Sequence, residues 1–147
     1  MADYATNKKA RFEYEILESY EAGISLRGFE VKAIRNGMAS LQGSYVLIRG
    51  AEAFLVGATI PPYQSGNTPP DYEPDRTRKL LLRREELRLL QGKTAMKGLT
   101  LAPIRLYNKN GKIKLGFALV RGKKKYDKRQ SIKRRDVERE LNRSERL

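Results

Sequence analysis

The C-terminal segment 121–147 imposes the strongest limit on how this chain can fold. It contains 12 Lys and Arg against 5 Asp and Glu, and therefore carries +7 of the total charge of +14. Its only aliphatic side chains are Ile132, Val137, Leu141 and Leu147. This apolar surface is too small to offset the conformational entropy lost when such a segment becomes ordered alone. We therefore expect one folded domain over 1–121 and a basic tail over 122–147 that is disordered when free.

A basic segment that cannot fold alone is most simply explained as one that folds on a polyanion, and RNA is the leading candidate. The net charge of +14 on 147 residues points the same way. An anionic membrane surface is the second candidate, but the tail lacks the Trp, Phe and Leu face of an interfacial helix. The chain also has no apolar run of the length that spans a bilayer. We therefore predict an RNA partner and no membrane association.

Several chemistries are excluded because the chain contains no Cys and no His. Thiol catalysis, disulfides, imidazole bases and the common zinc sites all require one of these residues. The absence of Cys gives no reason to propose an oxidising compartment, and the first ten residues lack the apolar core of a secretory signal. We therefore expect a cytoplasmic protein.

An acidic cluster formed by Asp71, Glu73 and Asp75 can in principle bind a divalent cation. It lies in 61–75, which contains five of the six prolines and must be a loop. We interpret the cluster as solvated. The sequence therefore predicts no metal, no cofactor and no enzymatic activity.

The N-terminal half shows both strand and helix periodicities. Alternating apolar residues predict a half-buried strand over 11–17, and a continuation through a bend at Gly23 to Leu26 fits the same pattern. Apolar spacings of three and four predict a short helix over 29–36. Segments 44–49 and 53–58 are predicted as two strands of a hairpin.

The C-terminal half of the predicted domain is similar. Segment 78–82 is either extended or the start of a helix. A helix is predicted over 83–91, with Leu87 and Leu90 inward and Gly92 just after its end. Strands are predicted over 99–107 and 112–120, joined by the turn dipeptide at 110–111. The inward residues of the last strand are Ile113, Leu115, Phe117 and Leu119.

These elements predict a mostly β fold of about six short strands with two or three short helices. Strands in meander-like pairs with an interrupting helix favour a small closed or partly open barrel. An OB-like β-barrel is the best match, and a split α+β sheet is the alternative.

The binding chemistry is concentrated in basic clusters. Together with the tail, they indicate two RNA-facing surfaces, one on the barrel and one on the tail. The clusters are Lys8, Lys9 and Arg11; Arg76, Arg78, Lys79, Arg83 and Arg84; and Lys112 with Lys114. Tyr20, Tyr107 and Tyr126 are candidates for stacking on bases. For Tyr20 and Tyr107 we favour packing in or at the rim of the core.

The tail also shows a helical pattern. Segment 128–147 contains neither Pro nor Gly, and Val137 and Leu141 are four residues apart. An isolated helix of this composition is marginal in water, but neutralisation by phosphates can stabilise it. The sequence therefore supports the hypothesis that the tail changes from disorder to helix on RNA.

Several stretches, in this order and spacing, resemble the SsrA-binding protein family, also called small protein B. The resemblance runs from about Asn7 to Arg129. The stretches are Asn-Lys-Lys-Ala-Arg at 7–11, Tyr-Glu-Ala-Gly-Ile at 20–24, Gly-Phe-Glu-Val-Lys-Ala-Ile-Arg at 28–35, Gly-Ser-Tyr at 43–45, Arg-Thr-Arg-Lys-Leu-Leu-Leu at 76–82, Gly-Leu-Thr-Leu at 98–101, Tyr107 with its Asn-Gly turn, and Gly-Lys-Lys-Lys-Tyr-Asp-Lys-Arg at 122–129.

The resemblance implies an OB-like barrel that binds the tRNA-like domain of transfer-messenger RNA. In that family the complex enters ribosomes stalled on messages without a stop codon, where the protein stands in the place of an anticodon arm. The basic tail enters the vacant message channel near the small-subunit decoding region and becomes helical. The implied process is trans-translation, that is, ribosome rescue with tagging of the nascent chain. We expect the protein to be a monomer.

The predicted barrel residues for RNA combine this resemblance with the basic clusters. They are Asn7, Lys8, Glu21, Gly23, Arg35, Arg78, Lys79, Leu81 and Lys114. The predicted tail residues for the ribosome are Lys123, Lys124, Tyr126, Asp127, Lys128, Arg129 and Lys133. One departure is Phe12, where the family often has His. Residue roles beyond Arg129 have no support from the resemblance.

Two other functions compete with this interpretation. A structural ribosomal or general translation-associated RNA-binding protein is also small and basic with an unfolded tail. A metal-dependent nuclease using the loop at Asp71 is the third possibility.

Overall fold

The fold is built on one antiparallel sheet, seen in a computed structural model that describes residues 3–64, 66 and 68–122. Within these residues seven strands follow the order β1-β6-β7-β2-β5-β4-β3, and three helices accompany them. The strands are β1 (Ala5–Thr6), β2 (Tyr14–Ile24), β3 (Tyr45–Arg49), β4 (Glu52–Val56), β5 (Arg78–Leu81), β6 (Leu99–Lys109) and β7 (Lys112–Gly122), and the helices are α1 (Lys8–Glu13), α2 (Gly28–Arg35) and α3 (Arg84–Thr94).

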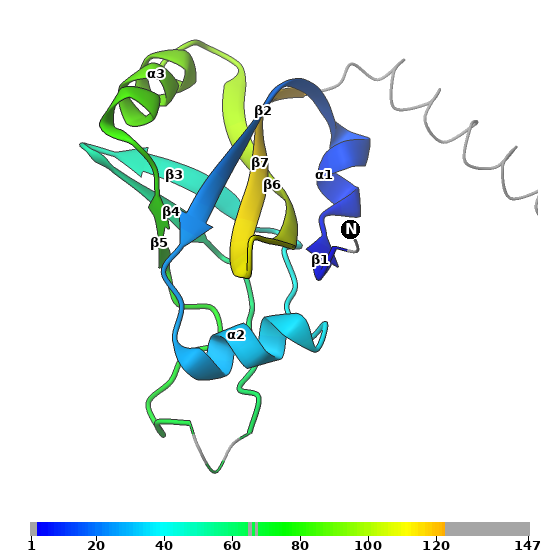
Figure 1. Cartoon of the computed structure of the whole chain (residues 1–147). Helices are drawn as coiled ribbons and strands as arrows, with labels where there is room; N and C mark the ends of the chain where they lie inside the picture. Colours follow the sequence, from blue (N-terminus) through cyan, green and yellow to red (C-terminus); the bar gives the residue numbers. More distant parts are fainter. Residues whose placement is uncertain (1–2, 65, 67, 123–147) are drawn as a thin grey trace, which may run out of the picture.

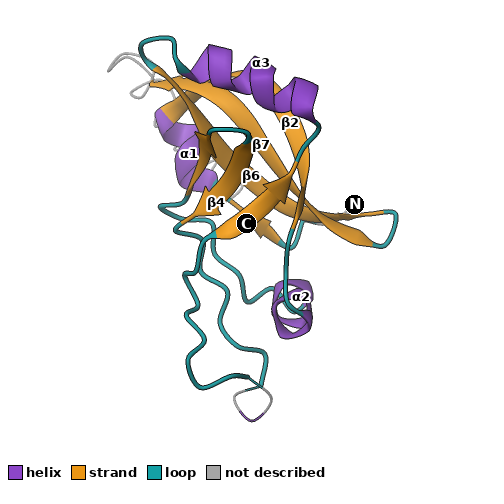
Figure 2. Ribbon diagram, turned by 90° about the vertical axis from the view of Figure 1, so that its left-hand side faces the viewer, coloured by secondary structure: helices purple, strands orange, loops and turns teal. Residues whose placement is uncertain are grey.

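The sheet curls into a partly open barrel (Figures 1 and 2). Its long strands β2, β7 and β6 lie side by side, and β3 at one end of the strand order approaches β6 near the other end. Strand β3 is not a hydrogen-bonded neighbour of β6, so the barrel is not closed by a continuous ladder. The predicted mostly β, OB-like fold is confirmed, with a two-residue β1 added to the strands that the sequence pattern indicated.

The β6–β7 hairpin follows directly from local sequence. Asn110 and Gly111 have φ angles of 53° and 77°, the left-handed region that a two-residue hairpin turn requires. The register then pairs Lys109 with Lys112. Alternate residues of β7 point into the barrel, and the predicted inward set Ile113, Leu115, Phe117 and Leu119 is buried. The sequence pattern of this hairpin is therefore confirmed.

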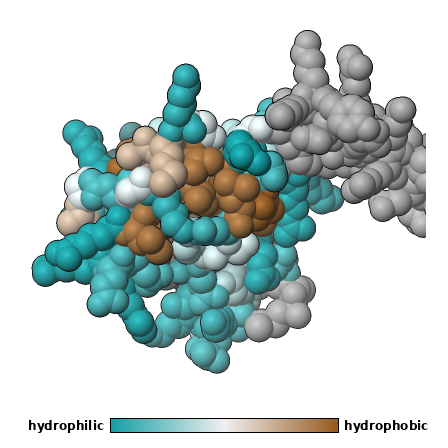
Figure 3. All heavy atoms as spheres, turned by 90° about the horizontal axis from the view of Figure 1, so that it is seen from above, coloured by the Kyte–Doolittle hydropathy of each residue, from teal (hydrophilic) through white to brown (hydrophobic). Residues whose placement is uncertain are grey.

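Two helices cover the two ends of the barrel (Figures 1 and 2). Helix α2 buries Ala33 and Ile34 at one end, and α3 buries Leu87 and Leu90 at the other. These side chains join the interior of the strands in one hydrophobic core. The long loop between β4 and β5 extends beyond α2 and contains the predicted proline-rich segment. From the α3 end, Figure 3 shows a patch of apolar surface.

Helix α1 corrects the prediction of a strand over 11–17. The chain forms α1 first and enters β2 only at Tyr14. Asn7 caps the helix by accepting a 3.2 Å hydrogen bond from the Ala10 amide, and its own amide donates to the Pro103 carbonyl at 2.9 Å. Ala10 packs on the outer face of the sheet against Ala118. This tertiary burial and the cap outweigh the alternating pattern over 11–17, of which only 14–17 lies in β2.

The structure decides between the two alternatives for segment 78–82 and corrects the predicted end of the helix over 83–91. Segment 78–82 is extended as β5, because Leu80 pairs with Ile24 of β2 and with Ala53 of β4. Helix α3 runs past Gly92 to Thr94, so the predicted stop at Gly92 is wrong. A glycine inside a helix costs about 1 kcal/mol relative to alanine. The Thr94 hydroxyl donates to the Leu90 carbonyl at 2.9 Å within this last turn.

Candidate RNA interface

Three of the predicted RNA residues meet on the outer face of the barrel, on three neighbouring strands. Gly23 of β2 pairs with Lys114 of β7 on one side and with Leu81 of β5 on the other. A Cβ atom at Gly23 would lie 3.3 Å from the Cβ of Leu81, tighter than most real contacts. The missing side chain therefore leaves room for Leu81, which is 57% exposed. An exposed leucine held over a glycine is an apolar contact point for a ligand.

Arg35 brings a fourth predicted residue to the same place. It ends α2, and its Nη2 donates to the Gly111 carbonyl at the tip of the β6–β7 hairpin at 3.1 Å. Arg35, Lys112 and Lys114 line a hollow of about 360 Å³ together with Gly23 and Leu81. Three cations around an apolar centre suit a nucleic-acid backbone, because phosphates pair with the charges while a sugar or base contacts the leucine.

Glu21 lies two residues before Gly23 on the same strand. The Tyr107 hydroxyl donates to its carboxylate, and Lys109 Nζ is 3.1 Å from Oε1. The Tyr107 hydrogen bond lowers the pKa of Glu21, burial opposes it, and Lys109 and Lys114 lower the pKa further. Burial, then the hydrogen bond to Glu21, raises the pKa of Tyr107 to about 12. At neutral pH this site therefore presents a charged acceptor, suited to a base amino group or a ribose hydroxyl.

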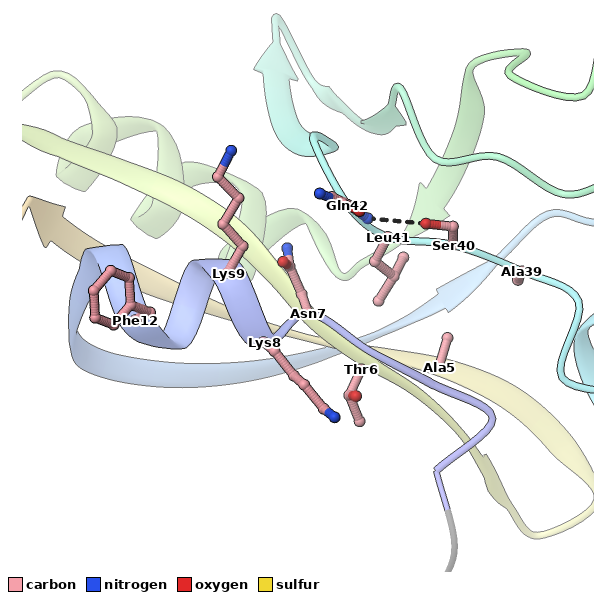
Figure 4. Close-up of a pocket in the computed structure, with 10 residues that line it drawn as sticks. All are labelled: Ala5, Thr6, Asn7, Lys8, Lys9, Phe12, Ala39, Ser40, Leu41 and Gln42. Atoms are coloured by element: carbon pink, nitrogen blue, oxygen red, sulfur yellow. Dashed lines mark hydrogen bonds between the residues drawn. The ribbon is translucent and has the colours of Figure 1, made fainter. Parts of the chain in front are cut away.

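Asn7 and Lys8 belong to a second hollow, of about 510 Å³, between the segment 5–12 and residues 39–42 (Figure 4). Lys8 is exposed. Asn7 is only 5% exposed, and both ends of its carboxamide are used by α1 and Pro103. In this structure Asn7 therefore positions α1, and Lys8 is the residue of the pair that can reach RNA.

The prediction that Arg78 contacts RNA is wrong. Its side chain is fully buried, and its guanidinium donates to Glu30 Oε2 from Nε at 2.9 Å and from Nη2 at 2.7 Å. It also donates to the Ala58 carbonyl at 2.7 Å. The next residue, Lys79, points outward and has its Nζ 3.6 Å from the carboxylate of Glu52. The strand alternation thus separates two basic neighbours into an interior ion pair and a surface charge.

Glu30 was not predicted, although it organises the interior at the α2 end. Besides Arg78 it accepts hydrogen bonds from Arg76 and from the Tyr72 hydroxyl, the latter at 3.0 Å. Burial raises the pKa of Glu30, but the bonds from Arg76, the Arg27 amide and Arg78 outweigh burial and lower it to about 2. One signal could have identified it, because Glu30 precedes the buried Ala33 and Ile34 by three and four residues, which places it on the inward face of α2.

The predicted packing role of two tyrosines is confirmed. The Tyr20 ring stacks on Phe117 with centroids 5.6 Å apart, and Tyr107 is 5% exposed. The third candidate, Tyr126, lies outside the described residues. So do all predicted tail residues, which are Lys123, Lys124, Tyr126, Asp127, Lys128, Arg129 and Lys133.

Within residues 3–64, 66 and 68–122, no three His, Cys, Asp or Glu side chains gather as a metal site. Asp71, Glu73 and Asp75 lie within these ranges. In the same ranges no helix has the length and apolar character needed to cross a membrane.

Comparison with known proteins points to one family. Residues 4–146 match the family described as SmpB protein. A relative from Nostoc punctiforme, named SsrA-binding protein, is 51% identical over 140 residues, which cover 95% of this chain and 90% of the relative. Another of that name, from Oleidesulfovibrio alaskensis, is 52% identical over 139 residues and covers 95% and 89%. A solved structure reported under "tmRNA-SmpB: a journey to the center of the bacterial ribosome" matches with a TM-score of 0.68 and 43% identity over 86% of this chain and 92% of that one.

Proposed function

The chain belongs to the SmpB family, and from this premise we propose that it binds transfer-messenger RNA and delivers it to stalled ribosomes in trans-translation. It is an RNA-binding adaptor and not an enzyme. The observation that carries the proposal is the meeting of Gly23, Leu81 and Lys114 on three adjacent strands, with Arg35 and Glu21 beside them.

The proposed RNA is the tRNA-like domain, bound by the outer face of the barrel. Lys114 and Arg35 pair with phosphates, Lys79 adds charge beside Leu81 on β5, and Lys8 adds charge at the second hollow. Leu81 packs against a sugar or base, and Glu21 accepts a hydrogen bond from a base amino group or a ribose hydroxyl. The relatives named SsrA-binding protein and the structure named for tmRNA and the ribosome support this choice of partner.

The proposed ribosomal contact belongs to the basic tail over 122–147. It enters the vacant message channel near the small-subunit decoding region and becomes helical there. The folded domain over 1–121 is then the part that holds the RNA. Because its proposed partner is the bacterial ribosome, we propose that the protein acts in the cytoplasm. We also propose that it is a monomer.

The first test is a binding titration that compares the tRNA-like domain of transfer-messenger RNA with an ordinary tRNA of similar size at moderate salt. Much tighter binding to the tRNA-like domain is expected. If about six phosphates are neutralised, the logarithm of the association constant should fall with that of the salt concentration at a slope of roughly −4 to −5. Equal affinity for the two RNAs would refute the specific site and favour a structural ribosomal protein.

The second test separates the barrel from the tail. A chain ending at Gly122 keeps the whole of β7. It should bind the tRNA-like domain nearly as well as the full chain while supporting no tagging of nascent chains in a reconstituted translation reaction. A parallel loss of both activities would contradict this division of labour.

A further inference from the structure

Arg105 of β6 forms a layered contact beside the proposed RNA face. Its guanidinium carbon lies over the ring of Tyr107, 3.9 Å from the ring centroid. We propose that Arg105 is a base-stacking residue, and that the hollow it lines takes one unpaired nucleotide of the bound RNA. This inference rests on the proposed RNA-binding function and adds a nucleotide site to it.

The strand geometry makes room for this stack. The β6–β7 register shifts between Pro103 and Arg105, and Arg105 then pairs with Gly116. A Cβ atom at Gly116 would lie 3.2 Å from Arg105 Cγ and 3.3 Å from Tyr107 Cε1. A side chain at this position would therefore press on both layers of the stack. Gly116 leaves the arginine and the tyrosine free to lie across the backbone of β7.

Each layer of the stack is held in place by its own carboxylate. Arg105 Nη1 donates to Asp3 at 2.8 Å, and the Tyr107 hydroxyl donates to Glu21. The tyrosine ring covers one side of the guanidinium, yet the Arg105 side chain remains 38% exposed. A planar cation that is oriented in advance loses little entropy on binding a flat ligand.

The hollow in front of Arg105 has the chemistry of a nucleotide site. Its volume of about 440 Å³ falls within the range of small-ligand pockets. Arg11 supplies a positive charge for a phosphate, and Ser19 and Glu21 supply polar groups for a base edge. Ile16 and Ile104 supply apolar walls. Proteins that read single-stranded RNA commonly stack unpaired bases on aromatic rings or arginine planes, so a base on Arg105 is the occupant that uses all of these groups.

Glu21 argues against a bare phosphate as the occupant. Its carboxylate lines the same hollow and carries a lowered pKa, so it stays charged and repels an anion placed next to it. A carboxylate has about four acceptor positions. Two donors, Tyr107 and Lys109, already use part of this capacity, and a base amino group can use the rest.

The test is Arg105→Lys, which keeps the charge and removes the planar stacking surface. The probe is the tRNA-like domain of transfer-messenger RNA, titrated with the full chain. We expect affinity to fall about 5- to 30-fold, the scale of one stacked base, with the salt slope unchanged. The matched control is Arg121→Lys, because Arg121 lies on β7, is 56% exposed and pairs with Glu15 at 2.7 Å. Its affinity should change less than about 2-fold.

A second variant tests the geometry without touching any charge. Gly116→Ala places a Cβ against both layers and should also weaken binding, with a melting temperature monitored in parallel. Chemical probing of the RNA should reveal one unpaired nucleotide that the natural protein protects and Arg105→Lys does not. Affinity of Arg105→Lys equal to the natural protein would overturn the stacking proposal and leave Arg105 as a simple charge.

The outcomes also separate this inference from the proposed function. A natural protein that fails to prefer the tRNA-like domain over ordinary tRNA refutes both. A selective natural protein whose Arg105→Lys variant is equally selective and equally tight refutes only the nucleotide site.

Discussion

The interior network at Glu30 and the surface network at Glu21 have nearly the same chemistry and opposite surroundings. Each is a glutamate that accepts from a tyrosine hydroxyl and from cationic side chains. Glu30 is fully buried, whereas the Glu21 side chain is 35% exposed. The comparison teaches that burial decides whether such a cluster stabilises the fold or remains available to a ligand.

The interior network joins elements that are distant in sequence. Glu30 lies on α2, Arg78 on β5, and Tyr72 and Arg76 in the loop before β5. Because Glu30 and Arg78 are fully buried, neither can exchange its contacts for water cheaply. Glu21 and Lys109 are partly exposed and can do so, which is why we assign RNA recognition to the surface network.

The largest expected effect comes from Arg78→Ala. Removing the guanidinium leaves the buried Glu30 carboxylate without its fully buried cation partner and opens a void, so we expect a loss of about 3–5 kcal/mol in the free energy of unfolding. Urea denaturation followed by circular dichroism measures it. A variant that loses less than about 1 kcal/mol would show that the interior pair does not hold α2 on the barrel.

A pH titration of stability sharpens the comparison next. The pKa of Glu30 is lowered from 4.5 to about 2, so the folded state binds fewer protons than the unfolded state between these values. The stabilisation is present above pH 4.5 and is lost as the pH falls toward 2. At about 1.4 kcal/mol per pH unit, this interval is worth about 3 kcal/mol.

The control for the acid transition is Arg76→Gln. It removes one partner whose side chain is partly exposed, so it should raise the pKa of Glu30 and move the acid loss to higher pH. An unchanged acid transition in this variant would assign the effect to other carboxylates.

The stabilisation from the surface network should be lost at high pH. The pKa of Tyr107 is raised from 10.0 to about 12, so its neutral phenol is favoured in the folded state. Its contribution, up to about 3 kcal/mol, is present below pH 10 and is lost as the pH rises toward 12. Spectrophotometric titration of tyrosinate should show a transition near pH 12 that Tyr107→Phe removes, while Tyr20 and Tyr72, whose pKa values are also raised, still titrate in the variant. If the two titration curves superimpose, the Tyr107–Glu21 contact is too weak to matter.

Glu21→Ala should separate affinity from stability. We expect about 10-fold weaker binding of the tRNA-like domain, because a charged acceptor is lost from the interface, and a change of less than about 1 kcal/mol in unfolding. Gel-shift titration and thermal melting measure the two quantities. Undiminished affinity would move the RNA face away from Glu21.

The smallest effect is expected for Lys79→Ala, the surface neighbour of Arg78. Its ion pair with Glu52 is exposed on both sides, so unfolding should change by less than about 0.5 kcal/mol. Denaturation under the conditions used for Arg78→Ala measures the contrast. A loss approaching that of Arg78→Ala would mean that charge, and not burial, governs both positions.

Much of the fold was predictable because β7 and α2 carry clear periodicities. The sequence could not distinguish Arg78 from Lys79, since adjacent basic residues differ only once a strand direction is known. It also could not place α1, because six residues form a helix only with tertiary support from Asn7 and Ala10. The candidate RNA face was named largely through family resemblance, and its Arg105 stack depends on a register shift that no sequence pattern reveals.

The pairing of β1 with β6 has a consequence for how the chain reaches this structure. Ala5 pairs with Leu106, so the first strand has no partner until about a hundred further residues have been synthesised. Contacts of such large sequence separation are formed slowly, because loop closure precedes any gain from pairing. During synthesis, the elements from β2 to α3 can begin to pack while residues 5–13 still lack their partner strand β6. The N-terminal segment that carries Lys8 is therefore expected to be among the last parts of the barrel to become native.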